Sequence, residues 1–586
     1  MIASDTHKFQ VDLGGVISLL SKNLYSSPGV YVRELLQNSI DALTARDDLD
    51  GGRRPIVICP CGVSSPSSPQ EEYSIQDSGI GVTLDQVDQF LATVGASSKR
   101  TDIEASRHNF IGQFGIGLLS CFLVTDEITV VSKSRHKPPI RWVGSSDGTY
   151  TVCALDDDLP IGTTVSFRPR PEATGWARSE QVVSLARKYG EFLPAQVVVH
   201  TPAGDQMVTH DFPFADFPAH RARVQTGTVG AVYAGVGIRQ QFDAIPVNIA
   251  STRTQGIIYL DDVGHGTKRS HPNRIYVNRM LVSDSDRELL PEWAFFAWAV
   301  VDSTGLRTTA SRETIVDDTA LRVTREAIGN AIEDWLADLA ENDPGRFQSF
   351  VQTHALALRE VVGSAPGLAS VVIPELLMET TKGPMRIKDI VAYSPTIFYT
   401  DSVKNFHRVA MFAPSDRLIV NAGYVHDGHI IEVLPAIFPG TTLSYVDPTT
   451  QTEDLVSPPV EEIGDVLDFE ARATTVLSEQ NTVVLVRILP DPQLTAIYIR
   501  EPCKYWGDPE GRLVMNWTNP VIRGLTQTLD DLVFARVIQL LFIQARMAGQ
   551  HDTESDRRLL STALNDLILI AVGAEHITPE EAEEKK

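Results

Sequence analysis

A chain of 586 residues is too long to fold around one hydrophobic core, and its 43% hydrophobic and 22% charged residues are typical of globular proteins. Its formal net charge of -24 argues against a general binder of nucleic acids or anionic membranes, because phosphates would be repelled outside local basic patches. The longest apolar runs, 294–301 and 567–574, are too short to span a bilayer, and the first residues lack a basic region followed by an apolar core. We therefore expect a multidomain cytoplasmic protein.

The first predicted element is an amphipathic helix with the sequence VYVRELLQNSIDAL, from Val30 to Leu43. At about 100° per residue, Glu34, Asn38 and Asp41 fall within a stripe of roughly 60°, opposite an apolar stripe. Two interpretations are open for this segment alone. The polar stripe either meets water on an ordinary surface helix, or it forms part of a site whose other residues lie further along the chain.

Five cysteines are scattered along the chain, and only Cys59 and Cys61 lie close together, as CPC at the end of a predicted strand. This pair could bind a metal or react, but no second pair of cysteines or histidines with ligand spacing accompanies it. We expect reduced thiols without a role in the site.

A short strand leads into a glycine turn in YSIQDSGIGVT, residues 73–83. The strand ends at Asp77, and Gly79 and Gly81 let the backbone turn tightly and approach a ligand. A carboxylate in this place can accept a hydrogen bond from a ligand amine, for instance the exocyclic amine of adenine. Alone, such a turn is also a common structural loop.

The second glycine cluster, FIGQFGIG at 110–117, precedes the apolar segment LLSCFLV, for which we expect a helix. Backbone amides of Gly112, Gly115 and Gly117 at a helix start could hold phosphate oxygens. The chain contains no Walker-type loop, so phosphate binding here would use another scheme that includes a cation.

The first helix offers residues for that scheme. Asn38 could ligate magnesium through its carboxamide oxygen, and Glu34 could orient and deprotonate a water near a terminal phosphate. The small, polar segment 93–109 before the second glycine cluster suits a lid.

Strand-like alternation and helical periods mix along the whole chain, which predicts an α/β and α+β multidomain architecture. A helix and a strand run into TPAGD near residue 200, and proline and acidic residues gather at 447–462. Two long helical patterns follow at about 529–549 and 554–573. These features predict domains at 1–201, 202–455 and 456–575, followed by a disordered tail at 576–586.

The order of these motifs, with GTTVSF at 162–167, resembles the ATP-binding fold shared by DNA gyrase, histidine kinases, MutL mismatch-repair proteins and heat-shock protein 90 chaperones. Residues 110–134 are similar to the heat-shock protein 90 family in particular. Residues 274–314 resemble the middle domain of that family, and 512–525 with the final helices resemble its dimerisation domain. The resemblance implies an N-terminal Bergerat-type α/β sandwich ATPase domain, an α/β middle domain and a mixed C-terminal dimerisation domain.

The resemblance also assigns roles to single residues. It implies that Glu34 is the general base, that Asn38 binds Mg²⁺ and that Asp77 reads adenine. It further implies that Arg312 reaches the terminal phosphate from the middle domain. The remaining nucleotide-contacting residues would be Asp41, Gly79, Gly81, Val82, Gly112, Phe114, Gly115, Gly117 and Thr163.

Four residues depart from the family pattern: Ala96 in the lid, Leu118 after the last glycine, and Thr309 and Val316 around Arg312. The last two stand where the family usually has polar amide side chains. These departures are compatible with nucleotide binding, and they bear on the rate of hydrolysis and on the mechanism of domain closure.

The resemblance implies an ATP-hydrolysing chaperone in protein folding, a homodimer joined through its C-terminal domain that closes around client proteins. We expect no nucleic-acid or membrane partner, and the tail lacks the motif that docks tetratricopeptide co-chaperones, which favours a bacterial-type member. Two alternatives stay open: a nucleotide-gated binding scaffold with weak or no hydrolysis, and a DNA-metabolism ATPase of the same superfamily. The N-terminal segment could exchange between protomers or form a simple edge strand.

Overall fold

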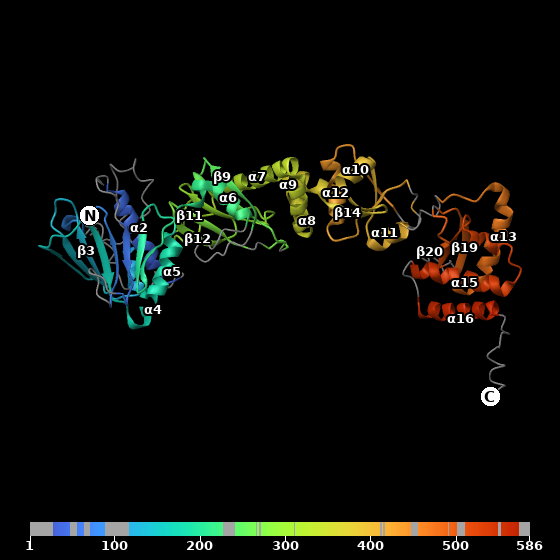
Figure 1. The fold of residues 1–586 in the computed structure, drawn as a ribbon, viewed down its shortest axis with the longest axis horizontal. Helices are drawn as coiled ribbons and strands as arrows, with labels where there is room; N and C mark the ends of the chain where they lie inside the picture. Colours follow the sequence, from blue (N-terminus) through green and yellow to red (C-terminus); the bar gives the residue numbers. More distant parts are fainter. Residues whose placement is uncertain are drawn as a thin grey trace, which may run out of the picture. The chain divides into compact units, whose positions relative to one another are not determined.

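The computed structural model of the protein describes residues 27–46, 55–63, 71–87, 117–226, 241–264, 266–268, 271–309, 311–410, 413, 416–446, 455–489, 491–500, 510–548 and 553–572. The chain divides into two compact units, Met1–Ala357 and Leu358–Lys586, and each has its own sheets and helices (Figure 1). This mixture of sheets and helices confirms the predicted α/β and α+β multidomain class. No helix within these ranges is long and apolar enough to cross a membrane.

The first unit begins with an eight-stranded sheet in the order β5-β4-β3-β6-β2-β1-β7-β8. Neighbouring strands are antiparallel except β1 and β7, which are parallel. The strands are β1 (Ile56–Cys59), β2 (Tyr73–Asp77), β3 (Glu127–Lys133), β4 (Ile140–Ser145), β5 (Tyr150–Ala154), β6 (Gly162–Phe167), β7 (Val197–Thr201) and β8 (Gly204–Met207). Because β8 continues this sheet to Met207, a boundary at residue 201 would cut the β7–β8 hairpin, and the predicted domain limits stay predictions.

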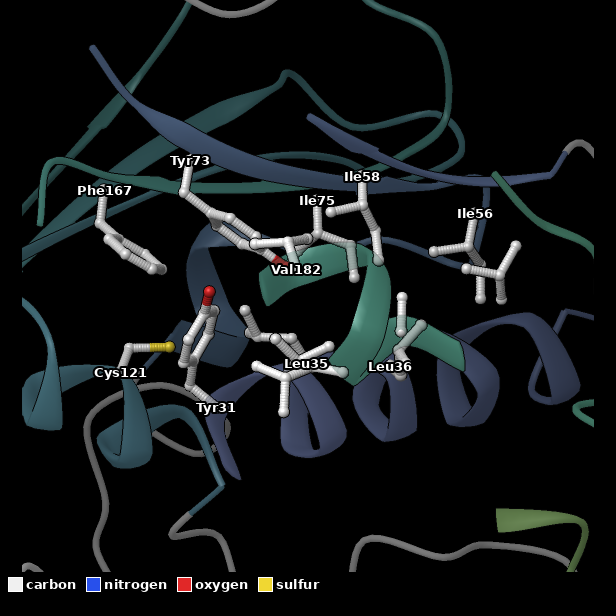
Figure 2. Close-up of a cluster of buried hydrophobic side chains, with 14 of the residues drawn as sticks. Tyr31, Leu35, Leu36, Ile56, Ile58, Tyr73, Ile75, Cys121, Phe167 and Val182 are labelled. Carbon is white, nitrogen blue, oxygen red and sulfur yellow. The ribbon is translucent and has the colours of Figure 1, made fainter. Parts of the chain in front are cut away.

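The predicted first helix is confirmed as α2 (Val30–Thr44), which packs with α5 (Ser179–Gly190) against this sheet. Figure 2 shows side chains of α2 facing those of β1 and β2. Tyr31, Tyr73 and Phe167 meet with ring centroids 4.9–5.4 Å apart, and all three are buried. Burial of each large apolar side chain contributes roughly 1.5–3 kcal/mol, so this core fixes the rotation of α2 about its axis.

The segment LLSCFLV forms a short 3-10 helix, η4 (Leu118–Leu123), in place of an ordinary helix. Cys121 and Phe122 of η4 are buried in the same core, and Leu118 packs against it. Packing of η4 against α2 therefore sets its position.

A five-stranded sheet completes the strands of the first unit, in the order β12-β11-β13-β10-β9. Helices α6 (Phe217–Gln225) and α7 (Thr319–Asn342) pack against β9, and α8 (Pro344–Val361) follows α7. The rings of Tyr259 and Trp298 stack 4.4 Å apart in its core. The strands are β9 (Gln241–Ile249), β10 (Thr254–Asp261), β11 (Asn273–Val277), β12 (Met280–Asp286) and β13 (Ala297–Ser303).

The second unit holds two further sheets, in the orders β15-β14-β17-β16-β18 and β19-β21-β20. The predicted closing helices are confirmed as α15 (Asp531–Ala548) and α16 (Glu554–Ala571), which pack together. The predicted tail at 576–586 lies outside the described residues. The strands are β14 (Leu377–Thr380), β15 (Gly383–Arg386), β16 (Thr396–Thr400), β17 (Ile419–Asn421), β18 (Thr442–Tyr445), β19 (Thr482–Arg487), β20 (Ala496–Arg500) and β21 (Gly511–Asn516). The helices are α9 (Pro366–Val372), α10 (Ile387–Tyr393), α11 (Val403–Ala410), α12 (Asp427–Ile437), α13 (Ile463–Val476) and α14 (Pro520–Leu525).

Candidate functional site

The polar stripe of α2 is not a uniformly solvated face. Asn38 is exposed and Asp41 is partly exposed, but Glu34 is only 3% exposed. A buried carboxylate is costly unless it is paired and hydrogen-bonded. The burial of Glu34 therefore directs attention to its partners.

The Glu34 carboxylate lies between two arginines. Arg33 Nη2 is 2.9 Å from Oε1, and Arg312 Nη1 is 3.2 Å from Oε2. Arg312 belongs to a hairpin that bridges Thr308 to Ile315, and its own backbone has a positive φ of 56°. A non-glycine residue with left-handed backbone is uncommon and marks a place where surrounding contacts hold the chain.

The same hairpin is also held to α2 through its backbone. Arg33 Nη2 donates to the carbonyl oxygen of Ser311 at 2.8 Å, and its Nη1 donates to that of Arg312 at 3.2 Å. Arg33 thus joins the Glu34 carboxylate to the Arg312 backbone. The structure therefore brings Glu34 and Arg312 together although 278 positions separate them.

Gln37 is a further residue of this contact that sequence reasoning missed. Its side-chain oxygen accepts a hydrogen bond from Arg312 Nη1, and the residue is 1% exposed. Its amide nitrogen has no hydrogen-bond partner within the described part of the chain. A buried donor without a partner costs about 1–3 kcal/mol. The sequence signal was its place one turn after Glu34 on the same helix.

Gly117 places the start of η4 against the polar side of α2. A Cβ atom added to Gly117 would lie 2.9 Å from Glu34 Oε2 and 3.7 Å from Asn38 Oδ1. Any other residue would crowd the Glu34 carboxylate. The other predicted residues of this cluster, Gly112, Phe114 and Gly115, lie outside the described residues, as do Ala96 and the predicted lid at 93–109.

Asp77 ends β2 and pairs across the sheet with Thr163 on β6. Burial raises the pKa of Asp77 to about 7, against the opposing effect of hydrogen bonds from the Gly79 and Thr163 backbones and the Ser39 side chain. The Gly79 amide donates to Asp77 Oδ1 at 2.8 Å. Burial therefore favours the protonated carboxyl group, and a ligand that donates a hydrogen bond would favour its ionised form.

The glycine turn after Asp77 packs too closely for larger residues. Gly81 has a φ of 68°, and an added Cβ atom would overlap the Lys133 carbonyl oxygen. At Gly79 an added Cβ atom would lie 2.5 Å from the Cβ atom of Ala42 on α2. These two glycines let the turn lie between α2 and β3.

Ser132 on β3 links the turn to β6. Its hydroxyl accepts a hydrogen bond from the Val82 amide at 2.8 Å and lies 2.9 Å from Thr163 Oγ1. The structure therefore brings Asp77, Val82 and Thr163 together, and Ser132 is a second residue that sequence reasoning missed. A serine at a buried position near the end of the strand EITVVSK was the available signal.

The residues fit a magnesium–nucleotide complex better than a separate metal cage. Within the described ranges, no group of three or more His, Cys, Asp or Glu residues gathers that could hold a metal ion. Asn38 offers a single carboxamide oxygen beside Gly117 and Glu34. Mg²⁺ is commonly held by one or two protein oxygens while phosphates and waters complete its octahedral shell.

Comparison with known proteins agrees with this geometry. The model of the family "Histidine kinase-, DNA gyrase B-, and HSP90-like ATPase" matches residues 25–146, and that of the family "Hsp90 protein" matches residues 262–378. The first match contains α2, β2 and η4, and the second contains Arg312.

Curated relatives include proteins named "Chaperone protein HtpG". That of Chlorobium luteolum is 26% identical over 371 residues, which is 58% of this chain and 57% of the relative. That of Desulfitobacterium hafniense is 24% identical, over 61% of this chain and 60% of the relative. That of Salinispora arenicola is 25% identical, over 67% of this chain and 66% of the relative.

The chain thus spans about three fifths of the length of the curated relatives it matches. The two family matches include the segments that hold Glu34 and Arg312. Over the matched segments the chain is similar to Hsp90 proteins and to the histidine kinase-, DNA gyrase B- and HSP90-like ATPases.

Proposed function

We propose that this chain is an ATP-dependent molecular chaperone that binds and hydrolyses ATP and uses the cycle to close and open a homodimer around client proteins. The observation that carries the proposal is the buried Glu34 carboxylate, placed between two arginines and beside Asn38 and Gly117. Phosphoryl transfer to water requires a base, a cation and a ligand for magnesium. Glu34 would supply the base, Arg312 the cation and Asn38 the oxygen ligand.

The proposed roles follow from the position of each group. Asp77 accepts a hydrogen bond from the adenine amine, while Thr163 and the turn from Gly79 to Val82 complete that end of the site. Glu34 orients a water and takes its proton at a carboxylate oxygen. Arg312 stabilises the charge that develops on the terminal phosphate.

Asn38 would hold the magnesium ion that accompanies ATP. The ion supplies charge neutralisation for the phosphates when it is bound. The Asn38 oxygen lies on the same side of α2 as the Glu34 carboxylate, so both face the start of η4. Asp41, one turn further along α2, and the amides of Gly112, Phe114, Gly115 and Gly117 would complete the nucleotide contacts.

Hydrolysis by this site is tested by steady-state ATP turnover of the wild type beside Glu34→Ala and Asp77→Asn. We expect wild-type turnover, nucleotide binding without turnover in Glu34→Ala, and loss of binding in Asp77→Asn. If the wild type binds ATP without turnover above the Glu34→Ala background, the proposal fails and a nucleotide-gated scaffold replaces it.

An apolar stripe on α16 supports dimerisation through the C-terminal helices. Leu564 and Ile568 of α16 and its C-cap residue Val572 follow one another at intervals of four residues and are 48%, 50% and 69% exposed. Residues at this spacing share one face of a helix, and such a face is suited to a second copy of the chain. Ile568→Asp should convert a dimer into monomers in multi-angle light scattering, while Arg558→Asp on the same helix should not.

The proposal places the protein in the cytoplasm. Most aromatic residues of the segment 293–298 belong to the core and not to a client-binding surface, since Phe295, Phe296 and Trp298 are at most 2% exposed. Client capture is tested by suppression of aggregation of a thermally unfolded model protein, with and without ATP.

A further inference from the structure

Gln37 makes an unusual use of a buried carboxamide. Its oxygen accepts a hydrogen bond from Arg312 Nη1, the same nitrogen that lies 3.2 Å from Glu34 Oε2. Its amide nitrogen has no hydrogen-bond partner among the described residues. The oxygen of the carboxamide is therefore bonded to Arg312, while its nitrogen is buried without a hydrogen bond to the described residues.

The orientation of this carboxamide follows from the chemistry of Arg312. A guanidinium group has only donors, so it can meet the oxygen of Gln37 but not its NH₂ group. Reversal of the carboxamide would bring donors together and lose the charge-assisted hydrogen bond. Buried polar groups without a hydrogen-bond partner are rare in proteins, and they are expected at functional sites.

A neutral acceptor is also suited to a site that receives phosphates. Glu34 already places one negative charge beside Arg312, and a second carboxylate would repel the terminal phosphate. The Gln37 oxygen holds the guanidinium without adding charge. Since Arg33 holds the backbone of Ser311 and Arg312, the hairpin is held by its backbone and the guanidinium by Gln37 and Glu34.

We propose that Gln37 is a positioning residue, which holds the Arg312 guanidinium beside Glu34 before nucleotide binds. Arg312 is then already in place when the terminal phosphate enters. The expected effect of Gln37 on hydrolysis rests on the proposed function. Its effect on the hairpin that carries Arg312 does not depend on nucleotide.

The kinetic test uses Gln37→Met, which has similar length and lacks the acceptor. We expect kcat for ATP hydrolysis to fall about tenfold, because a misplaced cation stabilises the transition state less. The KM for ATP and the Kd for nucleotide should stay within about twofold, since substrate binding does not require the contact. Thr44→Val is the matched control, because it removes a hydrogen bond of the same helix that reaches only the Ile40 carbonyl.

A double-mutant cycle separates positioning from general damage to the fold. If Gln37 acts through Arg312, Gln37→Met should lower kcat no further in an Arg312→Met background. Additive effects of the two substitutions would overturn the proposal. A rise in KM with unchanged kcat would also overturn it, because Gln37 would then serve binding.

Hydrogen exchange of the nucleotide-free chain tests the contact without any turnover. The amides of Arg312 and Val316 are bonded to the carbonyl oxygens of Thr309 and Arg307 within the hairpin. In Gln37→Met these amides should exchange at least about threefold faster than in the wild type or Thr44→Val, since the hairpin opens more often. Equal exchange would overturn the role of Gln37 even if the chain hydrolyses ATP. Faster exchange in a chain without turnover would reject the proposed function while the contact stands.

Discussion

Two buried carboxylates of the first unit each lie between arginines: Glu34 at the candidate site and Asp243 on β9. Glu34 is 3% exposed and Asp243 is fully buried. Charge and burial alone would assign both the same importance. The difference lies in how completely their surroundings are satisfied.

Asp243 is a fully bonded structural centre. Arg221 donates to both of its oxygens at 2.7 Å, Gln225 and the Ala244 amide each donate at 2.8 Å, and Arg346 lies 3.4 Å away. Burial would raise the pKa of Asp243, but these hydrogen bonds outweigh it and hold the pKa below its usual value. The carboxylate thus joins α6, β9 and α8.

Glu34 belongs to a contact that is incomplete. Arg33 and Arg312 pair with it, yet the side-chain nitrogen of Gln37 has no hydrogen-bond partner in the described part of the chain. A structural centre gains stability from satisfying every group, whereas a site keeps groups for a ligand. The comparison therefore contrasts a fully bonded structural residue with one for which we propose a role in chemistry, and this contrast can be tested directly.

The largest expected effect is on turnover by Glu34→Ala. We expect ATP hydrolysis to fall about 10²–10⁴-fold because the general base is lost, while nucleotide binding persists. Turnover is measured by phosphate release and binding by calorimetry. Glu180→Ala, an exposed acid on α5, is the control and should leave turnover unchanged. Loss of binding in Glu34→Ala would contradict the division of roles.

Asp243→Ala should act on stability instead. Removal of the buried carboxylate should cost about 1–3 kcal/mol, because Gln225 and the Ala244 amide lose their acceptor, whereas the Arg221 and Arg346 side chains are 41% and 39% exposed and can be solvated. The first unit should unfold at lower denaturant concentration, and turnover per folded molecule should be retained. Asp334→Ala on exposed α7 surface should change stability by less than about 0.5 kcal/mol. A stable Asp243→Ala variant would remove the contrast with Glu34.

Asp77→Asn should reveal a smaller effect that depends on pH. The pKa of Asp77 is raised from 3.8 to about 7, so between these pH values the folded chain holds a proton that the unfolded chain has released. Its contribution to stability is therefore lost as pH rises through that window. Asparagine cannot ionise, so Asp77→Asn should stabilise the nucleotide-free chain by roughly 1–2 kcal/mol more at pH 8 than at pH 5.5. Calorimetry at both pH values checks this, with exposed Asp85→Asn as control. An equal effect at both pH values would contradict the raised pKa.

The sequence predicted those parts of the site that short segments encode. The α2 helix follows from its apolar period, and β2, β6 and the glycine turn follow from alternation and from the demands of a tight backbone. The sequence did not reveal the roles of Gln37 and Ser132, because their hydrogen-bond partners lie far along the chain. Gln37 meets Arg312 275 positions later, and Ser132 meets Val82 50 positions earlier. The burial of Glu34 was hidden for the same reason, since a helical stripe does not reveal what packs on it.

The pairing of Glu34 with Arg312 also depends on the order of synthesis, because it cannot form before Arg312 has been made. The two residues are 278 positions apart, and at about 5–20 residues per second a ribosome needs roughly 15–55 seconds to make that length. The first sheet is complete at Met207, so it can close while the arginine does not yet exist. Until Arg312 is made, Glu34 has Arg33 as its cation, so the proposed site would lack its second positive charge.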